Sequence, residues 1–365
     1  MTNTERLHIL GQSLWLDNLT RELLTEGTLA RYIRELSLTG LTSNPTIFDK
    51  AIGKTPLYDE TIRRAAGAGR SDETIFFELA LEDLGQAAEL FRPAFEASGE
   101  TDGWVSLEVS PLLAYDTQGT IEQVKALHAR AQIPNLFIKI PGTPQGIPAI
   151  EECLVTGIPI NITLLFSAEQ YLAAANAYLR AVERRFAAGV RLPVRSVASL
   201  FVSRWDAAVA DKVPRELRNR LGIAIAKRTY RAYRELLASP RWIRLAEAGL
   251  PIQRLLWAST GTKDPSASDV LYVEALVAPD TINTMPDATL LAFSDHGRVG
   301  DTLPTDGGDA NDVLARFASA GIDTGALAEQ LQREGAQSFS DSWRELLARI
   351  GAKRGAKAAP PTKVY

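Results

Sequence analysis

The sequence has few of the residues that build disulfide frameworks and metal centres. Its 365 residues include one cysteine, Cys153, and three histidines, His8, His128 and His296. A single cysteine excludes a disulfide within the chain and leaves a cysteine-based zinc site short of ligands. The histidines form no cluster along the chain, so we expect no metal site.

Long apolar segments and an excess of positive charge are also absent. No stretch approaches the roughly 20 apolar residues that cross a bilayer, and the N-terminus has no apolar core of a signal peptide. The formal net charge of −4 provides no global positive field for nucleic acid. No GxGxxG fingerprint or P-loop lies between a strand and a helix. We therefore expect a cytoplasmic protein that binds neither membranes nor nucleic acid.

The composition that is present, 45% hydrophobic and 23% charged, is typical of a globular enzyme. Short apolar segments alternate with amphipathic ones along most of the chain. Strand–helix alternation predicts a parallel sheet, and eight repeats predict an α/β fold, a single (β/α)8 TIM barrel with additional C-terminal helices. The expected strands are Ser13–Asn18, Thr39–Asn44, Trp104–Ser110, Asn135–Pro141, Ile158–Leu165, Ser196–Ser203, Arg254–Thr260 and Leu271–Ala275.

The chain after the last expected strand should add helices and then a tail. Asp312–Ala320 and Thr324–Ile350 have helical patterns, the latter with a leucine-rich stripe. We assign residues 1–350 to one catalytic barrel domain that includes these helices. Residues 351–365 contain four basic residues, two prolines and no acidic residue, a composition that predicts a disordered basic tail.

Alternation within the strands predicts which side chains enter the barrel. Neighbouring side chains of a strand point to opposite faces, and helices must cover the outer face. The polar set is therefore expected inside, near the C-terminal strand ends where barrel active sites are built. In the fifth strand, Ile160, Ile162 and Leu164 should point outward. The residues expected inside are Asp17, Ser106, Glu108, Ser110, Phe137, Lys139, Asn161, Thr163, Ser199, Phe201 and Ser203.

Lys139 is the strongest candidate for chemistry, because it alone among the lysines lies inside an apolar strand segment, NLFIKIPG. Burying an ammonium group is costly unless it is paired or loses its proton. One interpretation is a structural ion pair with Glu108 or Asp17. The other is a nucleophile that forms a Schiff base, whose iminium withdraws electrons from a neighbouring carbon–carbon bond as aldol cleavage requires.

Other polar residues complete the candidate site. Asp17 and Glu108 could divide the proton transfers of a Schiff-base cycle, or serve as structural partners. Arg204 and Lys263 are candidates for binding a substrate phosphate near the last strands, although Lys263 is equally well explained as a solvated loop charge. Asn44, in TSNPT, could be a simple turn former. Candidates for contact with sugar hydroxyls or a catalytic water are Asn44, Asn161, Thr163 and Ser199.

Six motifs carry a resemblance to a known enzyme family, and it covers about residues 13–290. In chain order they are LWLDN, GLTSNPTIF, VSLEVSP, NLFIKIPGTPQGIPAI, GIPINITLLFSAEQY and SVASLFVSRWD. Together they resemble the transaldolases, in their longer bacterial branch. The resemblance implies class I aldolase chemistry without a metal or organic cofactor, in the non-oxidative pentose phosphate pathway. A dihydroxyacetone unit would pass from fructose 6-phosphate or sedoheptulose 7-phosphate to erythrose 4-phosphate or glyceraldehyde 3-phosphate.

The resemblance also implies roles for individual residues. Lys139 would be the Schiff-base lysine, Asp17 the acid/base at the C4 hydroxyl, and Glu108 a proton carrier through a water held with Thr163. The loop ASTGTKDP has Lys263 where many transaldolases have a second arginine, and the common SPFVGR reads SLFVSR here. The residues expected to bind substrate are Asn44, Asn161, Ser199, Phe201, Arg204 and Lys263.

Two other functions stay open. A fructose 6-phosphate aldolase releases free dihydroxyacetone, and that relative resembles this chain with a tyrosine in place of Phe201 and a glutamine in place of Glu108. Phe201 cannot donate a proton to the bound carbanion, so we expect transfer to exceed free cleavage. A non-catalytic sugar-phosphate-binding barrel should have lost a reactive residue, whereas Lys139, Asp17 and Glu108 are all present. Sugar phosphates are the expected partners, and a homodimer is the assembly considered.

Overall fold

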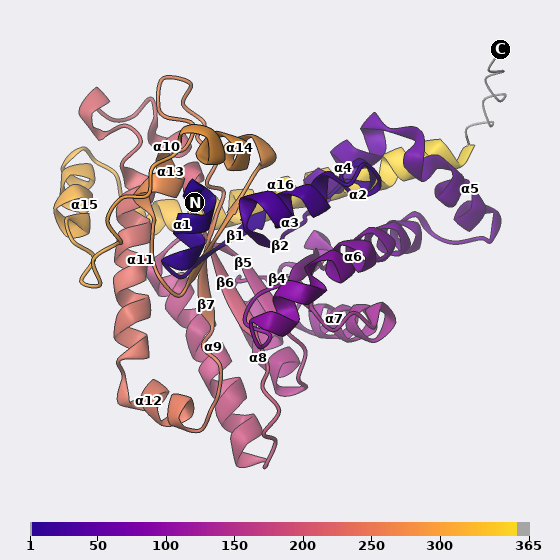
Figure 1. The fold of residues 1–365 in the computed structure, drawn as a ribbon, viewed down its shortest axis with the longest axis horizontal. Coiled ribbons are helices and arrows are strands. Elements are labelled where there is room, and N and C mark those ends of the chain that lie inside the picture. Colours follow the sequence, from indigo (N-terminus) through magenta and orange to yellow (C-terminus); the bar gives the residue numbers. More distant parts are fainter. Residues whose placement is uncertain (1, 356–365) are drawn as a thin grey trace.

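Eight parallel strands form the centre of the protein in a computed structural model that describes residues 2–355 (Figure 1). Their order is β2-β1-β8-β7-β6-β5-β4-β3. The edges β2 and β3 meet through two backbone hydrogen bonds, Leu41 N to Trp104 O at 3.0 Å and Gly103 N to Thr39 O at 2.8 Å. The barrel is therefore closed. The strands are β1 (Gln12–Leu16), β2 (Leu38–Leu41), β3 (Val105–Glu108), β4 (Leu136–Pro141), β5 (Ile160–Leu165), β6 (Ser196–Phe201), β7 (Arg254–Ala258) and β8 (Thr281–Met285).

Helices surround this barrel and continue beyond its last strand (Figure 1). Polar residues begin many of them: Ser71, Asp116 and Ser167 each accept a backbone hydrogen bond from the first turn of the helix that follows. The helices are α1 (Asn3–Ile9), α2 (Arg21–Thr25), α3 (Thr28–Leu36), α4 (Pro45–Lys54), α5 (Asp59–Gly67), α6 (Asp72–Ala97), α7 (Thr117–Ala131), α8 (Gly146–Val155), α9 (Ala168–Ala187), α10 (Ser203–Val209), α11 (Leu221–Leu237), α12 (Pro240–Glu247), α13 (Leu271–Ala275), α14 (Asp287–His296), α15 (Ala310–Ser319) and α16 (Thr324–Gly355), with short 3₁₀ turns η1 (Pro56–Tyr58), η2 (Pro111–Leu113) and η3 (Arg215–Leu217).

Seven of the eight expected strands are confirmed, and the eighth is wrong. Leu271–Ala275 is the short helix α13, and the eighth strand is Thr281–Met285. Of the three outward positions of β8, Thr281 and Asn283 are polar, and their side-chain oxygens accept hydrogen bonds from Gln12 and Thr260; Met285 alone is apolar. One apolar outward residue is too few for the alternation that a sequence pattern needs, so this strand is defined by its partners in the folded barrel.

The predicted alternation of faces separates two apolar clusters. Outward residues such as Leu14, Ile138 and Leu200 pack beneath the helices, whereas Trp15 and Phe137 pack inside the barrel. The Phe137 ring lies 4.1 Å, centroid to centroid, from the ring of Trp104 in a stacked arrangement. The interior therefore has an aromatic floor, which separates the polar residues at the C-terminal ends of the strands from a second polar group at their N-terminal ends.

Leu164 departs from the predicted alternation. It belongs to the inner cluster rather than the outer one, and Leu165 takes the outward position. The backbone of Leu164 has a φ of 58°, and the pairing of β5 with β6 shifts register between Ile162 and Leu165. A left-handed residue inserts one extra position into the strand, so the period of two is interrupted at this point.

The C-terminal helices cover one end of the barrel. α16, yellow in Figure 1, packs along α4, α5 and α6 and also contacts β5. The expected helices at 312–320 and 324–350 are confirmed as α15 and α16. However, α16 continues to Gly355, so residues 351–355 of the expected tail are helical. Residues 356–365, the remainder of that prediction, lie outside the described residues.

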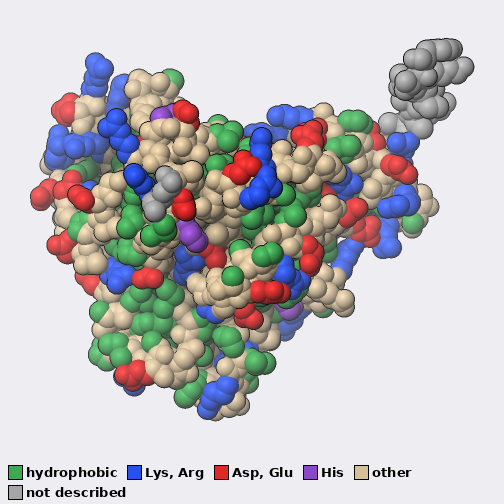
Figure 2. Space-filling model, in the orientation of Figure 1, with side chains coloured by type: hydrophobic (Ala, Val, Ile, Leu, Met, Phe, Trp, Pro, Cys, Tyr) green, Lys and Arg blue, Asp and Glu red, His purple; other side chains and the backbone are tan. Residues whose placement is uncertain are grey.

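The surface has charges of both signs in close mixture. Figure 2 shows Lys and Arg side chains interspersed with Asp and Glu side chains over the visible face. Within residues 2–355, no helix combines the length and apolar character needed to span a bilayer. With a formal net charge of −4, an anionic ligand is attracted by individual basic side chains rather than by the field of the whole molecule.

Candidate active site

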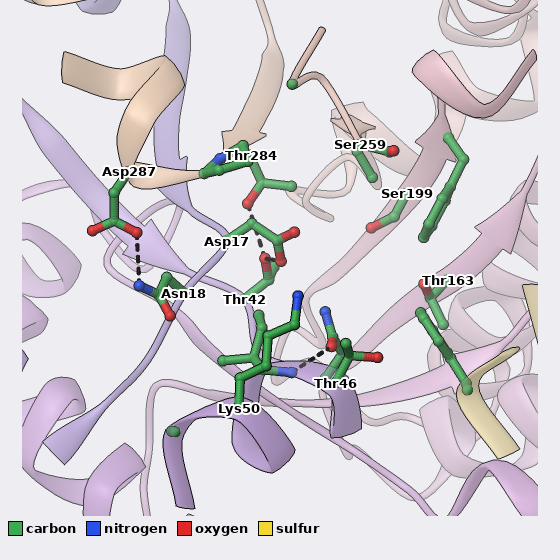
Figure 3. A pocket seen from close by; sticks show the side chains of 18 of the residues that line it. Asp17, Asn18, Thr42, Thr46, Lys50, Thr163, Ser199, Ser259, Thr284 and Asp287 are labelled. Carbon is green, nitrogen blue, oxygen red and sulfur yellow. Dashed lines mark hydrogen bonds between the residues drawn. The ribbon is translucent and has the colours of Figure 1, made fainter. Parts of the chain in front are cut away.

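A cavity of about 580 Å³ opens at the C-terminal end of the barrel strands (Figure 3). Most of the residues that the sequence singled out line it. Glu108 and Asn161 do not line it, because both side chains are buried directly behind its wall. The predicted residues that face the cavity are Asp17, Asn44, Lys139, Thr163, Ser199, Phe201, Arg204 and Lys263.

Lys139 projects from β4 into the barrel and is 4% exposed. Its Nζ lies 3.2 Å from Oε2 of Glu108 on the neighbouring strand β3, where the two residues are direct register partners. Nζ also donates a hydrogen bond to the carbonyl oxygen of Ser43 at 3.3 Å. The ion pair expected under the structural interpretation is thus present, and the amine still lines the cavity.

Glu108 is held in a place where its charge is costly. Burial raises the pKa of the Glu108 carboxyl, the nearby Lys139 and Arg204 oppose that rise, and Asp17 adds to it. Glu108 and Lys139 form an ion pair, but their geometry is not that of a hydrogen bond. Within residues 2–355, both Glu108 oxygens and the buried Thr163 hydroxyl lack a hydrogen-bond partner. These atoms are available to share a proton or to hold a reacting water.

Asp17 approaches the cavity from β1, on the side opposite β4. Thr42 Oγ1 donates to Asp17 Oδ1 at 2.8 Å, and the Thr284 hydroxyl lies 2.9 Å from that of Thr42 (Figure 3). The backbone N–H of Asp17 donates to the carbonyl oxygen of Met285 at 2.8 Å. Backbone and side chain are both fixed, so one carboxylate oxygen stays directed at the cavity.

The amide of Asn161 connects three strands behind the cavity. Its Nδ2 donates to Ser106 Oγ at 3.1 Å, and its Oδ1 accepts from Ser199 Oγ at 2.7 Å. Asn161 is therefore fully engaged with protein groups, and Ser199 presents its hydroxyl at the cavity wall. The expected contact between Asn161 and substrate stays a prediction, and in this structure its amide orients Ser199.

Asn44 caps a helix and also lines the cavity. Its Oδ1 accepts the backbone N–H of Ile47 at 3.1 Å, and Pro45 follows it as the first residue of α4. Asn44 is thus the N-cap of α4, as a turn-forming residue would be. The same side chain lines the cavity, where its amide nitrogen remains available to a ligand.

Arg204 lies in the first turn of α10, directly after β6. The buried carboxylate of Asp206 anchors α10 by accepting the backbone N–H groups of Leu221 at 2.9 Å and Gly222 at 3.1 Å. Burial raises the pKa of Asp206 to about 6. Burial also lowers the pKa of the Arg204 guanidinium, against the charges of Asp17 and Glu108. No other residue among 2–355 makes a hydrogen bond or ion pair with the Arg204 side chain, so its donors are free for an anion.

Lys263 lies in the exposed loop after β7 and lines the same cavity. Neither interpretation of this residue is decided by its surroundings.

Sequence reasoning missed several cavity residues, and Thr284 was missed because the eighth strand was misplaced. Across residues 2–355, no group of three His, Cys, Asp or Glu side chains is arranged to hold a metal ion. The missed residues include Asn18, Thr42, Thr46, Lys50, Lys54, Thr284, Asp287 and Phe339.

Comparison with known proteins gives consistent matches over nearly the whole chain. A family model described as transaldolase/fructose-6-phosphate aldolase matches residues 14–350. A protein named transaldolase from Parafrankia sp. (strain EAN1pec) is 44% identical over 362 residues, which cover 97% of this chain and 98% of the relative. Transaldolase from Thiobacillus denitrificans is 43% identical over 359 residues, covering 96% and 100%. Transaldolase from Saccharopolyspora erythraea is 44% identical over 356 residues, covering 96% and 97%.

Proposed function

The chain belongs to the transaldolase/fructose-6-phosphate aldolase family, and from that membership we propose how its residues perform the reaction. The protein is a transaldolase, a transferase that moves a dihydroxyacetone unit from a ketose phosphate to an aldose phosphate through a lysine Schiff base. The observation that supports these roles best is the position of Lys139, buried at the cavity wall, 3.2 Å from Glu108.

Schiff-base formation begins at Lys139. Glu108 takes a proton from the Lys139 ammonium, and the resulting neutral amine attacks C2 of fructose 6-phosphate or sedoheptulose 7-phosphate. Glu108 gives this proton to the new C2 alkoxide, takes a second proton from the attached nitrogen, and returns it to the C2 hydroxyl as water leaves, which gives the iminium. The raised pKa of Glu108 suits it to this exchange, because it holds a proton closer to neutral pH than an ordinary glutamate does.

Carbon–carbon cleavage then depends on Asp17. Its carboxylate takes the proton of the C4 hydroxyl, the C3–C4 bond breaks, and the electron pair moves to the iminium nitrogen. The aldose phosphate leaves, and an enamine of dihydroxyacetone stays on Lys139. The hydrogen bond from Thr42 keeps Asp17 in place while it loses and regains its charge.

Transfer reverses these steps with the second substrate. The enamine carbon attacks the aldehyde of erythrose 4-phosphate or glyceraldehyde 3-phosphate, and Asp17 gives its proton to the new hydroxyl. Water, activated between Glu108 and Thr163, then hydrolyses the iminium and frees Lys139. Asn44 and Ser199 hydrogen-bond the sugar, while Arg204 binds its phosphate and Lys263 adds charge from the loop.

Trapping the covalent intermediate tests this proposal. Borohydride reduction in the presence of fructose 6-phosphate should leave a three-carbon adduct on Lys139, located by peptide mass spectrometry. Lys139→Met should abolish the adduct and lower kcat at least about a thousandfold, because the covalent path is lost. Lys50→Met, an exposed lysine of the same cavity, should keep the adduct. Full turnover by Lys139→Met would refute the proposal.

The nearest second function is cleavage with release of free dihydroxyacetone, since the matching family model covers both activities. Phe201 lines the cavity and carries no acidic hydrogen for the bound carbanion. We therefore expect little dihydroxyacetone unless an acceptor aldehyde is absent for a long time. If dihydroxyacetone is the main product with no acceptor present, the chain acts chiefly as an aldolase.

We also propose the pentose phosphate pathway as the setting of this reaction and the cytoplasm as its location. Relatives named transaldolase, which this chain matches over nearly their full length, support this proposal. A homodimer is the assembly we expect. Sedimentation velocity of the purified protein over a range of concentrations tests the assembly.

A further inference from the structure

The guanidinium of Arg204 contacts two aromatic rings from distant parts of the chain. Its Cζ is 5.0 Å from the ring centroid of Phe201 on β6 and 5.6 Å from that of Phe339 on α16. Within residues 2–355, Arg204 has no hydrogen bond or ion pair to hold its side chain. The two rings, together with the close approach of Gly335, are therefore the contacts that fix its direction.

This arrangement suits an arginine that binds an anion. The face of an aromatic ring attracts a cation, and the attraction increases when water is excluded. Contact with two rings also limits the rotation of the guanidinium, while its N–H donors remain free of protein partners. An arginine fixed in this way loses less conformational entropy when it binds a phosphate.

Phe339 is itself held firmly at the mouth of the barrel. On one side of it, Gln332 Nε2 donates to the carbonyl oxygens of Gly142 and Leu164, each at 3.0 Å. On the other side, the hydroxyls of Ser342 and Thr46 lie 2.8 Å apart. These contacts attach α16 to the barrel at both ends of the segment that bears Phe339, whose ring is 4% exposed.

A purely packing role is the alternative explanation for a buried phenylalanine. Trp343, one turn further along α16, shows what such a role looks like. Its ring packs against Phe76 and Phe77 of α6, at 4.9 and 5.7 Å, and it does not line the cavity. Phe339 differs because it lines the cavity and faces the cations of both Arg204 and Lys139, the latter with Nζ at 6.0 Å.

We propose that Phe339 is a positioning residue which clamps Arg204 against Phe201 and so determines how strongly the enzyme prefers phosphorylated to unphosphorylated substrates. This inference rests on the proposed function, in which Arg204 binds the substrate phosphate. It assigns to α16, outside the barrel strands, a direct part in substrate selection.

Kinetics with two acceptors that differ only in phosphate test this proposal. In a two-step transfer, kcat/KM for the acceptor reports the second half of the reaction alone. Phe339→Leu should lower kcat/KM for glyceraldehyde 3-phosphate about tenfold, the size expected for a desolvated cation–ring contact, and that for glyceraldehyde by less than about twofold. The inhibition constant of inorganic phosphate should rise by the same factor of about ten. Phe339→Tyr, which keeps the ring face, should restore both values.

Two further variants separate positioning from packing. Trp343→Leu should lower the urea midpoint of unfolding yet leave the ratio between the two acceptors unchanged. In an Arg204→Met background, Phe339→Leu should have no further effect on that ratio, because the residue through which it acts is gone. Phe339→Met is the second volume-preserving variant, should the leucine variant fold poorly.

An equal loss of kcat/KM for both acceptors in Phe339→Leu would overturn the proposal, since it would indicate a general packing role. Failure of the proposed function is distinguishable from this result. In that case the unmodified protein would give no three-carbon adduct on Lys139 after borohydride reduction. Direct calorimetric titration with inorganic phosphate still compares Phe339→Leu with the unmodified protein, and equal affinities would again refute the role of Phe339.

Discussion

A buried lysine–glutamate pair can be a structural ion pair or a catalytic pair, and in this protein Lys139 and Glu108 serve as both. Lys139 Nζ and Glu108 Oε2 are 3.2 Å apart, which gives each buried charge a partner. The pair also contains the nucleophile and the group that exchanges its proton. The structural and the catalytic interpretation of Lys139 therefore do not compete, because the pairing that stabilises the resting enzyme prepares the first proton transfer.

The raised pKa of Glu108 predicts the acidic limb of the pH profile. Glu108 must be ionised in the free enzyme to take a proton from the attacking amine. As pH falls through its raised pKa, the carboxylate is protonated and kcat/KM declines. The decline should therefore occur above the ordinary glutamate value of 4.5. It is measured as kcat/KM for fructose 6-phosphate at successive pH values.

Glu108→Gln cannot titrate, so its acidic limb should move to lower pH. Its kcat should also fall on the order of a hundredfold through loss of the proton carrier. Glu334→Gln removes an exposed carboxylate on α16 and should keep the original limb. If the acidic limb of the pH profile is unchanged in Glu108→Gln, a group other than Glu108 causes that limb.

The residues that the sequence identified share a local signal. Lys139, Glu108 and Thr163 all lie on inward positions of strands whose outward positions are apolar, and the period of two makes such positions readable. Sequence reasoning missed Thr284 because two outward residues of β8, Thr281 and Asn283, are polar and hide the alternation of a buried strand. Sequence reasoning missed Phe339 because an aromatic residue in the apolar stripe of a helix is ordinarily a packing residue. The neighbouring sequence does not show which surface the ring contacts.

At the scale of secondary structure elements, the approach of α16 to the barrel depends on a glycine. A Cβ at Gly335 would lie 2.9 Å from Leu164 Cδ2 and 3.2 Å from Arg204 Nη1. Leu164 occupies that position only because the left-handed residue in β5 directs it inward. The irregular strand and the glycine are therefore complementary features of one contact.

Gly335→Ala should consequently weaken both folding and phosphate binding. The added methyl group should push α16 outward, at a cost of about 1–3 kcal/mol in the free energy of unfolding, and raise KM for phosphorylated substrates several-fold. Urea unfolding and steady-state kinetics measure the two effects. Gly355→Ala, where a Cβ meets nothing within 4 Å, is the matched control. A more stable Gly335→Ala, as helix propensity alone predicts, would contradict the close contact.

At the scale of the whole molecule, the N-terminal end of the barrel has a structural role and the C-terminal end a catalytic one. Below the aromatic floor, Arg254 Nη2 donates to Ser13 Oγ and to the carbonyl oxygen of Thr281, both at 2.7 Å. Its Nη1 lies 3.9 Å from the buried Asp102, which also accepts from Trp15 Nε1 at 2.8 Å. This polar network closes the N-terminal end of the barrel, while the reactive groups occupy the C-terminal end.

Arg254→Met should therefore reduce stability without changing catalysis. It leaves Asp102 buried without a cation, which should lower the free energy of unfolding by about 3 kcal/mol. The value of kcat should stay within about twofold, because the aromatic floor separates the network from the cavity. Arg228→Met, which removes a surface ion pair with Glu169, should cost less than about 1 kcal/mol. A large loss of kcat at unchanged stability would disprove the separation of the two ends.

The sequence by itself determined the barrel class, seven of its strands and the inward polar set around Lys139. These features depend on periodicity within single segments, which the chain retains before it folds. The tertiary structure alone decided the eighth strand, the inward turn of Leu164 and the contact between Phe339 and Arg204. Each of these depends on contacts between distant segments, and an apolar helix stripe or a short polar strand shows the need for a partner without identifying it.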